Sequence, residues 1–282
     1  MAKAKRLLIE NIKLVDVVIE LRDARIPQAS ANPLLATIIG SKPRIIVLAK
    51  ADLADKEQTR AWVTYFEKVE HTRAVALDGR DRKGVNRLLL PQIKALAAPL
   101  VPRSKQGNFP LRPERSMVVG IPNIGKSTLI NALAGRATAK TGALPGVTRS
   151  KQWIKLNGGV ELLDTPGLLW PKFDDPLVAR LLAVTGAVGE GGFDQYELAS
   201  WLLSYLASHF PALLSRYKLD EGDSQLPGYQ LLEAVGRARG CLVAGGNVDL
   251  SRAADLVLAD FRTGKLGPIT LESPPSKGDR DG

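Results

Sequence analysis

The stretch GIPNIGKST at residues 120–128 has the spacing Gly-x-x-x-x-Gly-Lys-Ser of a phosphate-binding loop. A short apolar run at residues 117–120 precedes it, and Leu129, Ile130 and Leu133 follow at helical spacing. In this strand–loop–helix context backbone amides converge on phosphate oxygens, the lysine reaches the outer phosphates, and the next hydroxyl binds magnesium. An ordinary glycine turn is the alternative that this context disfavours. The predicted phosphate contacts are Asn123, Ile124, Gly125, Lys126, Ser127 and Thr128.

A second apolar run, residues 160–163, ends at Asp164 in the sequence LLDTPG. A carboxylate at the end of such a strand can reach magnesium through water, and the amide of Gly167 can meet the terminal phosphate. Between the two motifs lies PGVTR, in which Thr148 has the spacing to close over the metal and that phosphate. We therefore predict Ser127, Thr148 and Asp164 as magnesium ligands and Gly167 as a further phosphate contact.

A guanine-specific site also needs a carboxylate that faces the base, usually in Asn-Lys-x-Asp after a strand. No such motif follows Asp164, but residues 49–52, after the apolar run at 44–48, read Ala-Lys-Ala-Asp. Asp52 can still read guanine and the Lys50 stem can lie along the base. Backbone amides at the end of the next strand, at Ala76 and Leu77, can meet the guanine oxygen. A Lys-x-Asp turn is common by itself, so this prediction depends on the phosphate loop.

The base-reading residues precede the phosphate loop, which is the reverse of their order in ordinary small GTPases. Circular permutation of the fold gives this order, and close chain termini make it tolerable. The Pro-rich segment 97–114 then bridges the old end of the domain to its old beginning. The new end falls directly after the switch at residues 164–167.

The apolar patterns predict an α/β protein with two domains. Strands are expected at 15–21, 44–48, 74–77, 117–120, 152–156 and 160–163, with helical patterns between them, as in a doubly wound, mostly parallel sheet. We assign residues 1–174 to a permuted GTPase domain and 175–272 to a smaller all-α domain with helices at 197–210 and 231–239. The last residues, 273–282, are expected to be disordered.

Composition restricts the partners and the compartment. The 282 residues carry a formal net charge of +10, which favours binding to polyanions such as RNA, DNA or an anionic membrane. The single cysteine excludes an internal disulfide, and no apolar run is long enough to cross a bilayer. We expect a cytoplasmic protein without a membrane partner, and a monomer.

Several motifs together resemble the ribosome biogenesis GTPase A family, the circularly permuted GTPases of the YlqF type. They are MAKAKR, DARIP at 23–27, KAD at 50–52, GIPNIGKST, PGVTR, DTPGLLWPK at 164–172, GRARG, GGNVD and DFRTGKLGPITLE, and they cover nearly the whole chain. The resemblance implies a rRNA-binding factor in large-subunit assembly that hydrolyses GTP to GDP with Mg²⁺ and leaves on hydrolysis. It also implies a low intrinsic rate, stimulation by the ribosomal particle and by K⁺, and a K⁺ contact at Asn123.

The sequence departs from this family in places that bear on catalysis. Leu168 stands where many GTPases carry a water-orienting glutamine, and the N-terminal histidine of relatives is missing, so no catalytic residue is assigned. Ala49 and Ala31 replace the asparagine and arginine usual in relatives. These departures keep open an alternative: a nucleotide-gated rRNA-binding module with very slow or no hydrolysis. A GTPase on anionic lipid is a third reading, against which the lack of a lipidation motif argues.

Overall fold

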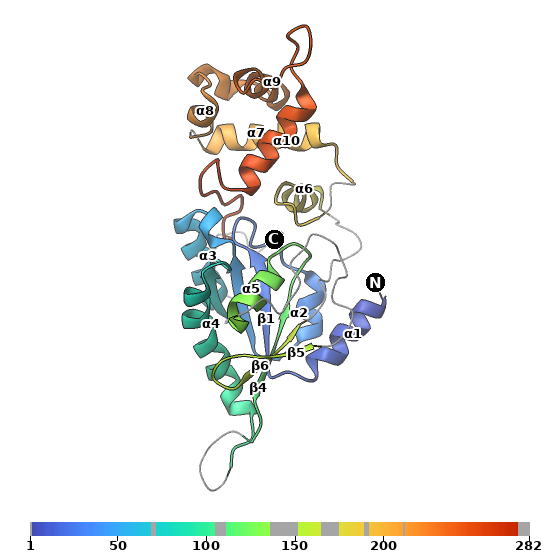
Figure 1. The fold of residues 1–282 in the computed structure, drawn as a ribbon, viewed down its shortest axis with the longest axis vertical. Coiled ribbons are helices and arrows are strands. Elements are labelled where there is room, and N and C mark those ends of the chain that lie inside the picture. The colour runs from blue at the N-terminus through green and yellow to red at the C-terminus, as the bar shows by residue number, and fades with distance from the viewer. Residues whose placement is uncertain are drawn as a thin grey trace. The chain divides into compact units, whose positions relative to one another are not determined.

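The computed structural model describes residues 2–68, 72–104, 111–135, 152–164, 175–188, 192–210 and 212–275. The chain divides into two compact units, residues 1–173 with 270–282, and residues 174–269 (Figure 1). The elements of the first unit are α1 (Ala2–Ile12), β1 (Val17–Asp23), α2 (Pro33–Ile39), β2 (Arg44–Ala49), η1 (Ala51–Leu53), α3 (Lys56–Lys68), β3 (Arg73–Leu77), α4 (Arg82–Ala97), η2 (Ala98–Leu100), β4 (Glu114–Val119), α5 (Lys126–Ala134), β5 (Gln152–Lys155) and β6 (Val160–Asp164).

The strands of the described ranges form one six-stranded sheet in the order β3-β2-β1-β4-β6-β5. The strands β3, β2, β1, β4 and β6 run parallel to one another. The sixth, β5, pairs antiparallel with β6 and is the last strand on that side of the sheet. β4, the first strand after the Pro-rich linker, lies beside β1 in the middle of the sheet. The expected mostly parallel, permuted sheet is therefore confirmed, and the linker joins two halves of one sheet.

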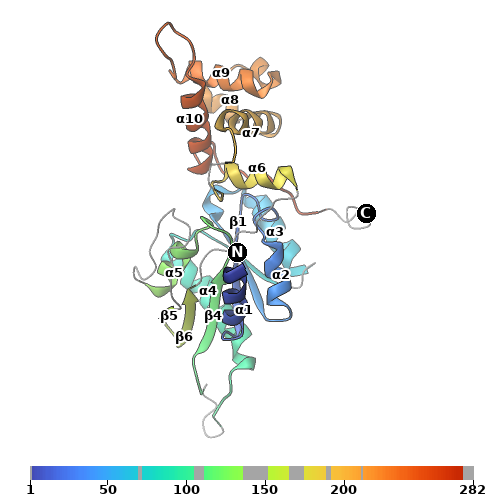
Figure 2. The same cartoon turned by 90° about the vertical axis from the view of Figure 1, so that its right-hand side faces the viewer.

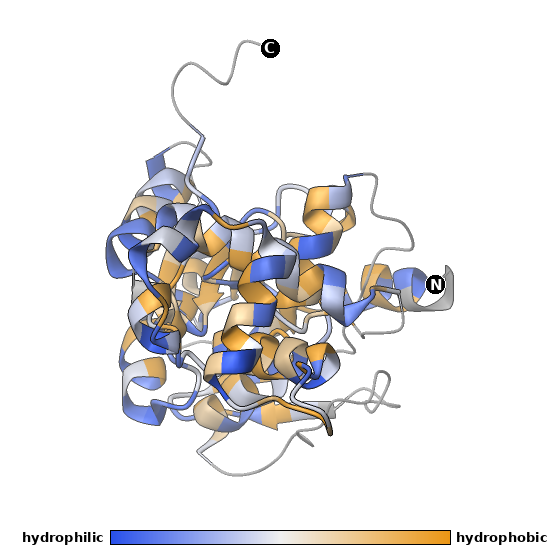
Figure 3. Ribbon diagram, turned by 90° about the horizontal axis from the view of Figure 1, so that it is seen from above, coloured by the Kyte–Doolittle hydropathy of each residue, from blue (hydrophilic) through white to orange (hydrophobic). Residues whose placement is uncertain are grey.

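Helices cover both faces of the sheet. Figure 2 shows α1, α2 and α3 on one side of the strands and α4 and α5 on the other. On the first face, Leu8 and Ile12 of α1 pack with Val18, Met117 and other buried residues. Apolar and polar residues alternate around the helices, as Figure 3 shows, so each helix turns one face to a core.

The central strand β1 is buried along its whole length although it contains charged residues. Glu20 accepts hydrogen bonds from Arg22 at 2.8 Å and from Arg44 of β2 at 3.0 Å. The Arg22 guanidinium also lies 4.9 Å from the centre of the Phe66 ring. These pairings compensate charges that an apolar sheet face could not otherwise hold.

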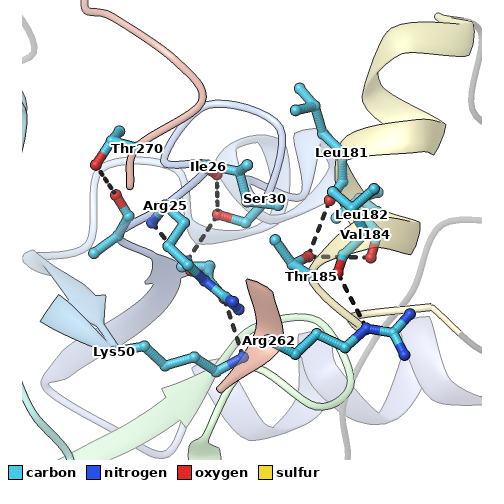
Figure 4. A network of polar contacts seen from close by, with 12 residues as sticks. Arg25, Ile26, Ser30, Lys50, Leu181, Leu182, Val184, Thr185, Arg262 and Thr270 are labelled. Atoms are coloured by element: carbon cyan, nitrogen blue, oxygen red, sulfur yellow. Dashed lines mark hydrogen bonds and ion pairs between the residues drawn. The ribbon is translucent and has the colours of Figure 1, made fainter. Parts of the chain in front are cut away.

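The second unit is helical, as expected. Its elements are α6 (Pro176–Val184), α7 (Gln195–His209), α8 (Ala212–Tyr217), η3 (Glu221–Gln225), α9 (Gly228–Ala238) and α10 (Leu250–Arg262). Arg262 of α10 donates to the carbonyls of Ala183 and Val184, and the Thr185 hydroxyl donates to the Leu181 carbonyl (Figure 4). These side chains therefore add donors to the carbonyl groups in the last turn of α6, where backbone partners become scarce.

The segment after α10 differs from the expected domain boundary at residue 272. Residues 270–275, hereafter the C-terminal segment, belong to the first unit. The Leu271 amide donates to the Arg25 carbonyl at 2.8 Å, and the Glu272 carboxylate accepts from the amides of Gln28 and Ala29 at 2.7 and 2.9 Å. Bonds over such a separation along the chain leave no local pattern in the sequence. Of the expected disordered tail, residues 276–282 lie outside the described residues.

Candidate nucleotide-binding site

The carboxyl ends of five parallel strands place the predicted site residues along one edge of the sheet. β4 leads into the phosphate loop and α5, where Gly120 has φ +153° and Gly125 has φ +108°. A Cβ on Gly120 would lie 2.9 Å from the Leu21 carbonyl oxygen, so only glycine fits this close approach. Gly125 is the N-cap of α5 and has no side chain to occupy the first-turn amides. The loop therefore presents backbone N–H groups at a helix N-terminus, the geometry that binds phosphate.

Lys126, the first residue of α5, has its ammonium folded over the loop. Its Nζ donates to the carbonyl oxygens of Gly120 at 3.2 Å and Ile121 at 2.6 Å. Burial lowers the pKa of Lys126 to about 8, and the carboxylate of Asp164 opposes that change. An anionic ligand would stabilise the charged form of this buried lysine, because the ligand compensates the hydration that burial removes.

Asp164 is the last residue of β6 and is buried at the carboxyl edge beside β4. The register pairs Leu163 with Met117, so Asp164 reaches the level at which β4 leads into the phosphate loop. The structure thus brings Asp164 near Lys126 and the start of α5, where Ser127 lies. Thr148, Gly167 and Leu168 lie outside the described residues.

The residues predicted to read the base lie at the same edge. Lys50 follows β2 in a left-handed conformation, φ 59°, and Asp52 lies in η1 directly after it. Ala76 and Leu77 end β3, and Leu77 is paired with Ala49. A Cβ on Gly79 would lie 3.4 Å from the Thr128 methyl carbon, so the loop after β3 also approaches α5. The segments predicted to bind the base and the phosphates are therefore neighbours in space.

The buried carboxylate of Asp23 binds the ammonium group of Lys50. Its Nζ lies 3.0 Å from Asp23 Oδ2, and Arg25 donates to both oxygens of Asp23 at 2.9 and 2.8 Å (Figure 4). Burial alone would raise the pKa of Asp23, but Arg25 and Lys50 hold it well below its usual range. The carboxylate is therefore ionised, and it fixes the position at which the base-reading loop begins.

Comparison with known proteins identifies the family. Residues 115–189 match the family described as 50S ribosome-binding GTPase. The chain is 45% identical to "Ribosome biogenesis GTPase A" of Priestia megaterium over 97% of its own length and 94% of that protein. It is 34% identical to the Thermotoga maritima protein of the same name over 96% and 91% of the two chains. The chain belongs to the ribosome biogenesis GTPase A family.

Solved structures of this family agree with the fold. The GDP-bound structure of T. maritima YlqF superposes with a TM-score of 0.68 at 27% identity, over 95% of this chain and 99% of that one. The GNP-bound structure of T. maritima YlqF gives a TM-score of 0.66 at 28% identity, over 97% and 99%. The resemblance inferred from the motifs is confirmed, as is the permuted GTPase fold.

Sequence reasoning missed two parts of the candidate site. The first is the buried Asp23–Arg25 pair. Both residues belong to the DARIP motif, but no local pattern in the sequence indicates that Asp23 reaches Lys50. The second is Arg80, whose guanidinium donates to the carboxylates of Asp78, at 3.1 Å, and Asp52. The Asp-x-Arg spacing in LDGRD was the one available signal, because an aspartate commonly bonds the backbone two residues later.

Proposed function

We propose that this protein is a GTP-binding switch that hydrolyses GTP to GDP and phosphate during assembly of the large ribosomal subunit. The observation that carries the proposal is the convergence of the phosphate loop, Asp164 and the Lys50–Asp52 turn at one sheet edge. Each supplies a different part of GTP recognition: phosphates, metal and base. In a member of this family, that combination favours a guanine nucleotide over other phosphorylated ligands.

The phosphate end of GTP would lie over the N-terminus of α5. Backbone amides of residues 123–128 donate to the phosphate oxygens, and the Lys126 ammonium leaves the loop carbonyls to neutralise the outer phosphates. Gly167 would add an amide at the terminal phosphate, and the exposed Asn123, with φ 53°, would help to hold K⁺.

The oxygen donors near Lys126 fit Mg²⁺. The described residues contain no cluster of three or more His, Cys, Asp or Glu side chains, and Mg²⁺ needs few protein ligands because phosphates and water complete its shell. Ser127 would bind the ion directly and Asp164 through water, with Thr148 as a third ligand. A bound Mg²⁺ supplies charge stabilisation as the terminal phosphate leaves.

The base end would lie over the turn after β2. Asp52 accepts from the ring N–H and exocyclic amine of guanine, Lys50 lies along the base, and the backbone at Ala76 and Leu77 meets the guanine oxygen. An adenine offers an acceptor where guanine offers the ring N–H, so the Asp52 carboxylate rejects it. We infer that Asp52 sets the specificity of the site.

The proposed partner is the large ribosomal subunit with its rRNA. The family description names the 50S particle, and the net charge of +10 suits a phosphate-rich surface. The helical unit begins directly after the switch segment, so a change at the terminal phosphate can be passed on to it, and hydrolysis would release the protein. We place this activity in the cytoplasm; the described residues include no helix that could span a bilayer.

Phosphate release measured with and without purified large subunits, in K⁺ and then in Na⁺, tests the proposal. We expect slow phosphate release from the protein alone. Release should be faster when large subunits and K⁺ are present together. Leu168 and Ala49 favour one competing outcome, nucleotide-dependent binding to rRNA without turnover. No turnover in any condition would overturn the proposed hydrolysis, and binding to anionic vesicles but not to subunits would overturn both the proposal and this alternative.

A further inference from the structure

Arg80 joins the two base-reading loops, one after β2 and one after β3. Its backbone amide and Nε donate to Asp78 Oδ1 at 2.9 and 3.1 Å, and its terminal nitrogen lies 3.3 Å from Asp78 Oδ2. The same terminal nitrogen donates to Asp52 Oδ2. Asp78 thus anchors the guanidinium, which reaches across to the carboxylate expected to read guanine.

This bridge lies where backbone pairing between the two strands has stopped. The β2–β3 ladder ends at the pair Ala49 and Leu77, so Asp52 and Asp78 lie beyond it. The bridge Asp78–Arg80–Asp52 connects the two loops beyond the end of this ladder. Ala49, the last residue of β2, has no polar side-chain atom that could make such a connection.

We propose that Arg80 is a positioning residue for guanine recognition, because it connects the loop after β3 to the carboxylate of Asp52. The inference rests on the proposed function, since it concerns the same base site. Each carboxylate oxygen has two lone pairs, so Asp52 accepts from Arg80 and from the guanine donors at once. The planar guanidinium, fixed on Asp78, restricts Asp52 to the orientation in which both of its oxygens face the base.

The exposure of the bridge limits its strength. The side chain of Arg80 is 70% exposed and that of Asp52 25% exposed, so water screens much of their attraction. Ion pairs of this kind change equilibria by about twofold to fivefold. The bridge should therefore affect only the contacts with the guanine base. Contacts between the phosphate loop and the phosphates should not change.

Equilibrium binding of fluorescently labelled GDP and IDP to the 282-residue chain tests this role. IDP lacks the exocyclic amine, so the ratio of its Kd to that of GDP reports how well Asp52 is oriented. Arg80→Ala is expected to weaken GDP binding about twofold to fivefold and to lower that ratio. Asp78→Asn, which weakens the anchor, is expected to act in the same direction, and Arg87→Ala on the exposed face of α4 is the matched control.

A double-mutant cycle separates positioning from general damage. In an Asp52→Ala background the bridge is already gone, so Arg80→Ala should change GDP affinity no more than Arg87→Ala does. Tighter or unchanged GDP binding by Arg80→Ala in the otherwise native chain would mean that Arg80 competes with the base or is irrelevant, and overturns the proposal. An equal loss for GDP and IDP also overturns it. If the unmodified chain binds no GDP, the proposed function itself fails.

Discussion

Replacing Asp23 by alanine should destabilise the first unit more than any exposed charge substitution. Asp23 is fully buried, and the Arg25 side chain, which donates to both of its oxygens, is 1% exposed. Removing one partner of a buried pair leaves the other charge without compensation and costs about 3–5 kcal/mol. The ammonium of Lys50, whose side chain is 26% exposed, can turn to water, so Arg25 carries most of this cost.

Urea unfolding followed by tryptophan fluorescence, in a background in which the other three tryptophans are replaced by phenylalanine, measures the effect. The remaining Trp62 is 1% exposed and lies in the first unit. With a urea dependence of about 2–3 kcal/mol per molar, the midpoint should fall by about 1–2.5 M. Hydrogen exchange at β1 and β2 assigns the loss to this unit. Glu10→Ala is the matched control, since its pair with Arg6 is exposed and contributes well under 1 kcal/mol.

Two further results decide whether the reasoning about Asp23 holds. The double variant Asp23→Leu/Arg25→Met should recover most of the lost stability, because it removes both charges together. The folded-state pKa of Asp23 lies below its ordinary value of 3.8. Its stabilisation is therefore present above that pH and is lost as the pH falls below it. A midpoint for Asp23→Ala equal to that of Glu10→Ala would refute the argument.

Three other predictions follow from single contacts. Because burial lowers the pKa of Lys126 to about 8, raising the pH from 7 to 9 should weaken GDP binding about tenfold, and a flat titration of Kd would contradict this. A Cβ on Gly228 would lie 2.0 Å from the Ser200 carbonyl oxygen, so Gly228→Ala should lower the melting temperature of the helical unit, whereas Gly222→Ala, which meets nothing within 4 Å, should not. Burial raises the pKa of Glu272 to about 7 from 4.5, so folding favours its neutral form and the unfolding free energy should decrease by about 1–3 kcal/mol between pH 4.5 and 7; the urea midpoint of Glu272→Ala should lack this slope.

The parts of the site that sequence reasoning found are those coded by local patterns. The phosphate loop depends on nine consecutive residues, and the strands around it were recognised from apolar runs, with β1 displaced by two residues at each end from the expected 15–21. That displacement has a cause in the chain. Arg22 and Asp23 are charged, so the apolar run ends before them in the sequence. In the fold Glu20 pairs with Arg22 and Arg25 pairs with Asp23, and these pairings allow both charges to be buried in β1.

The parts that were missed depend on residues distant in the chain. Asp23 meets Lys50 across 27 positions, and the Asp55 amide donates to the Thr270 hydroxyl across 215. No spacing rule connects such residues, because the sheet order alone decides which strand ends become neighbours. The contact of Arg80 with Asp52, across 28 positions, is of the same kind.

The chain connections of the helical unit lead to both ends of the proposed nucleotide site. Its first residue, 174, comes ten positions after Asp164, and its last, 269, directly precedes the C-terminal segment. There Thr270 accepts from the Asp55 amide, close after Asp52, and Leu271 donates to the carbonyl of Arg25, the residue that pairs with Asp23. One connection therefore begins at the residues proposed to bind the metal and terminal phosphate, and the other ends on the residues that support the turn proposed to read the base. A partner that binds the helical unit has a covalent route to each end of the nucleotide, and reciprocity of linked equilibria requires that the nucleotide affects that partner's binding by the same free energy.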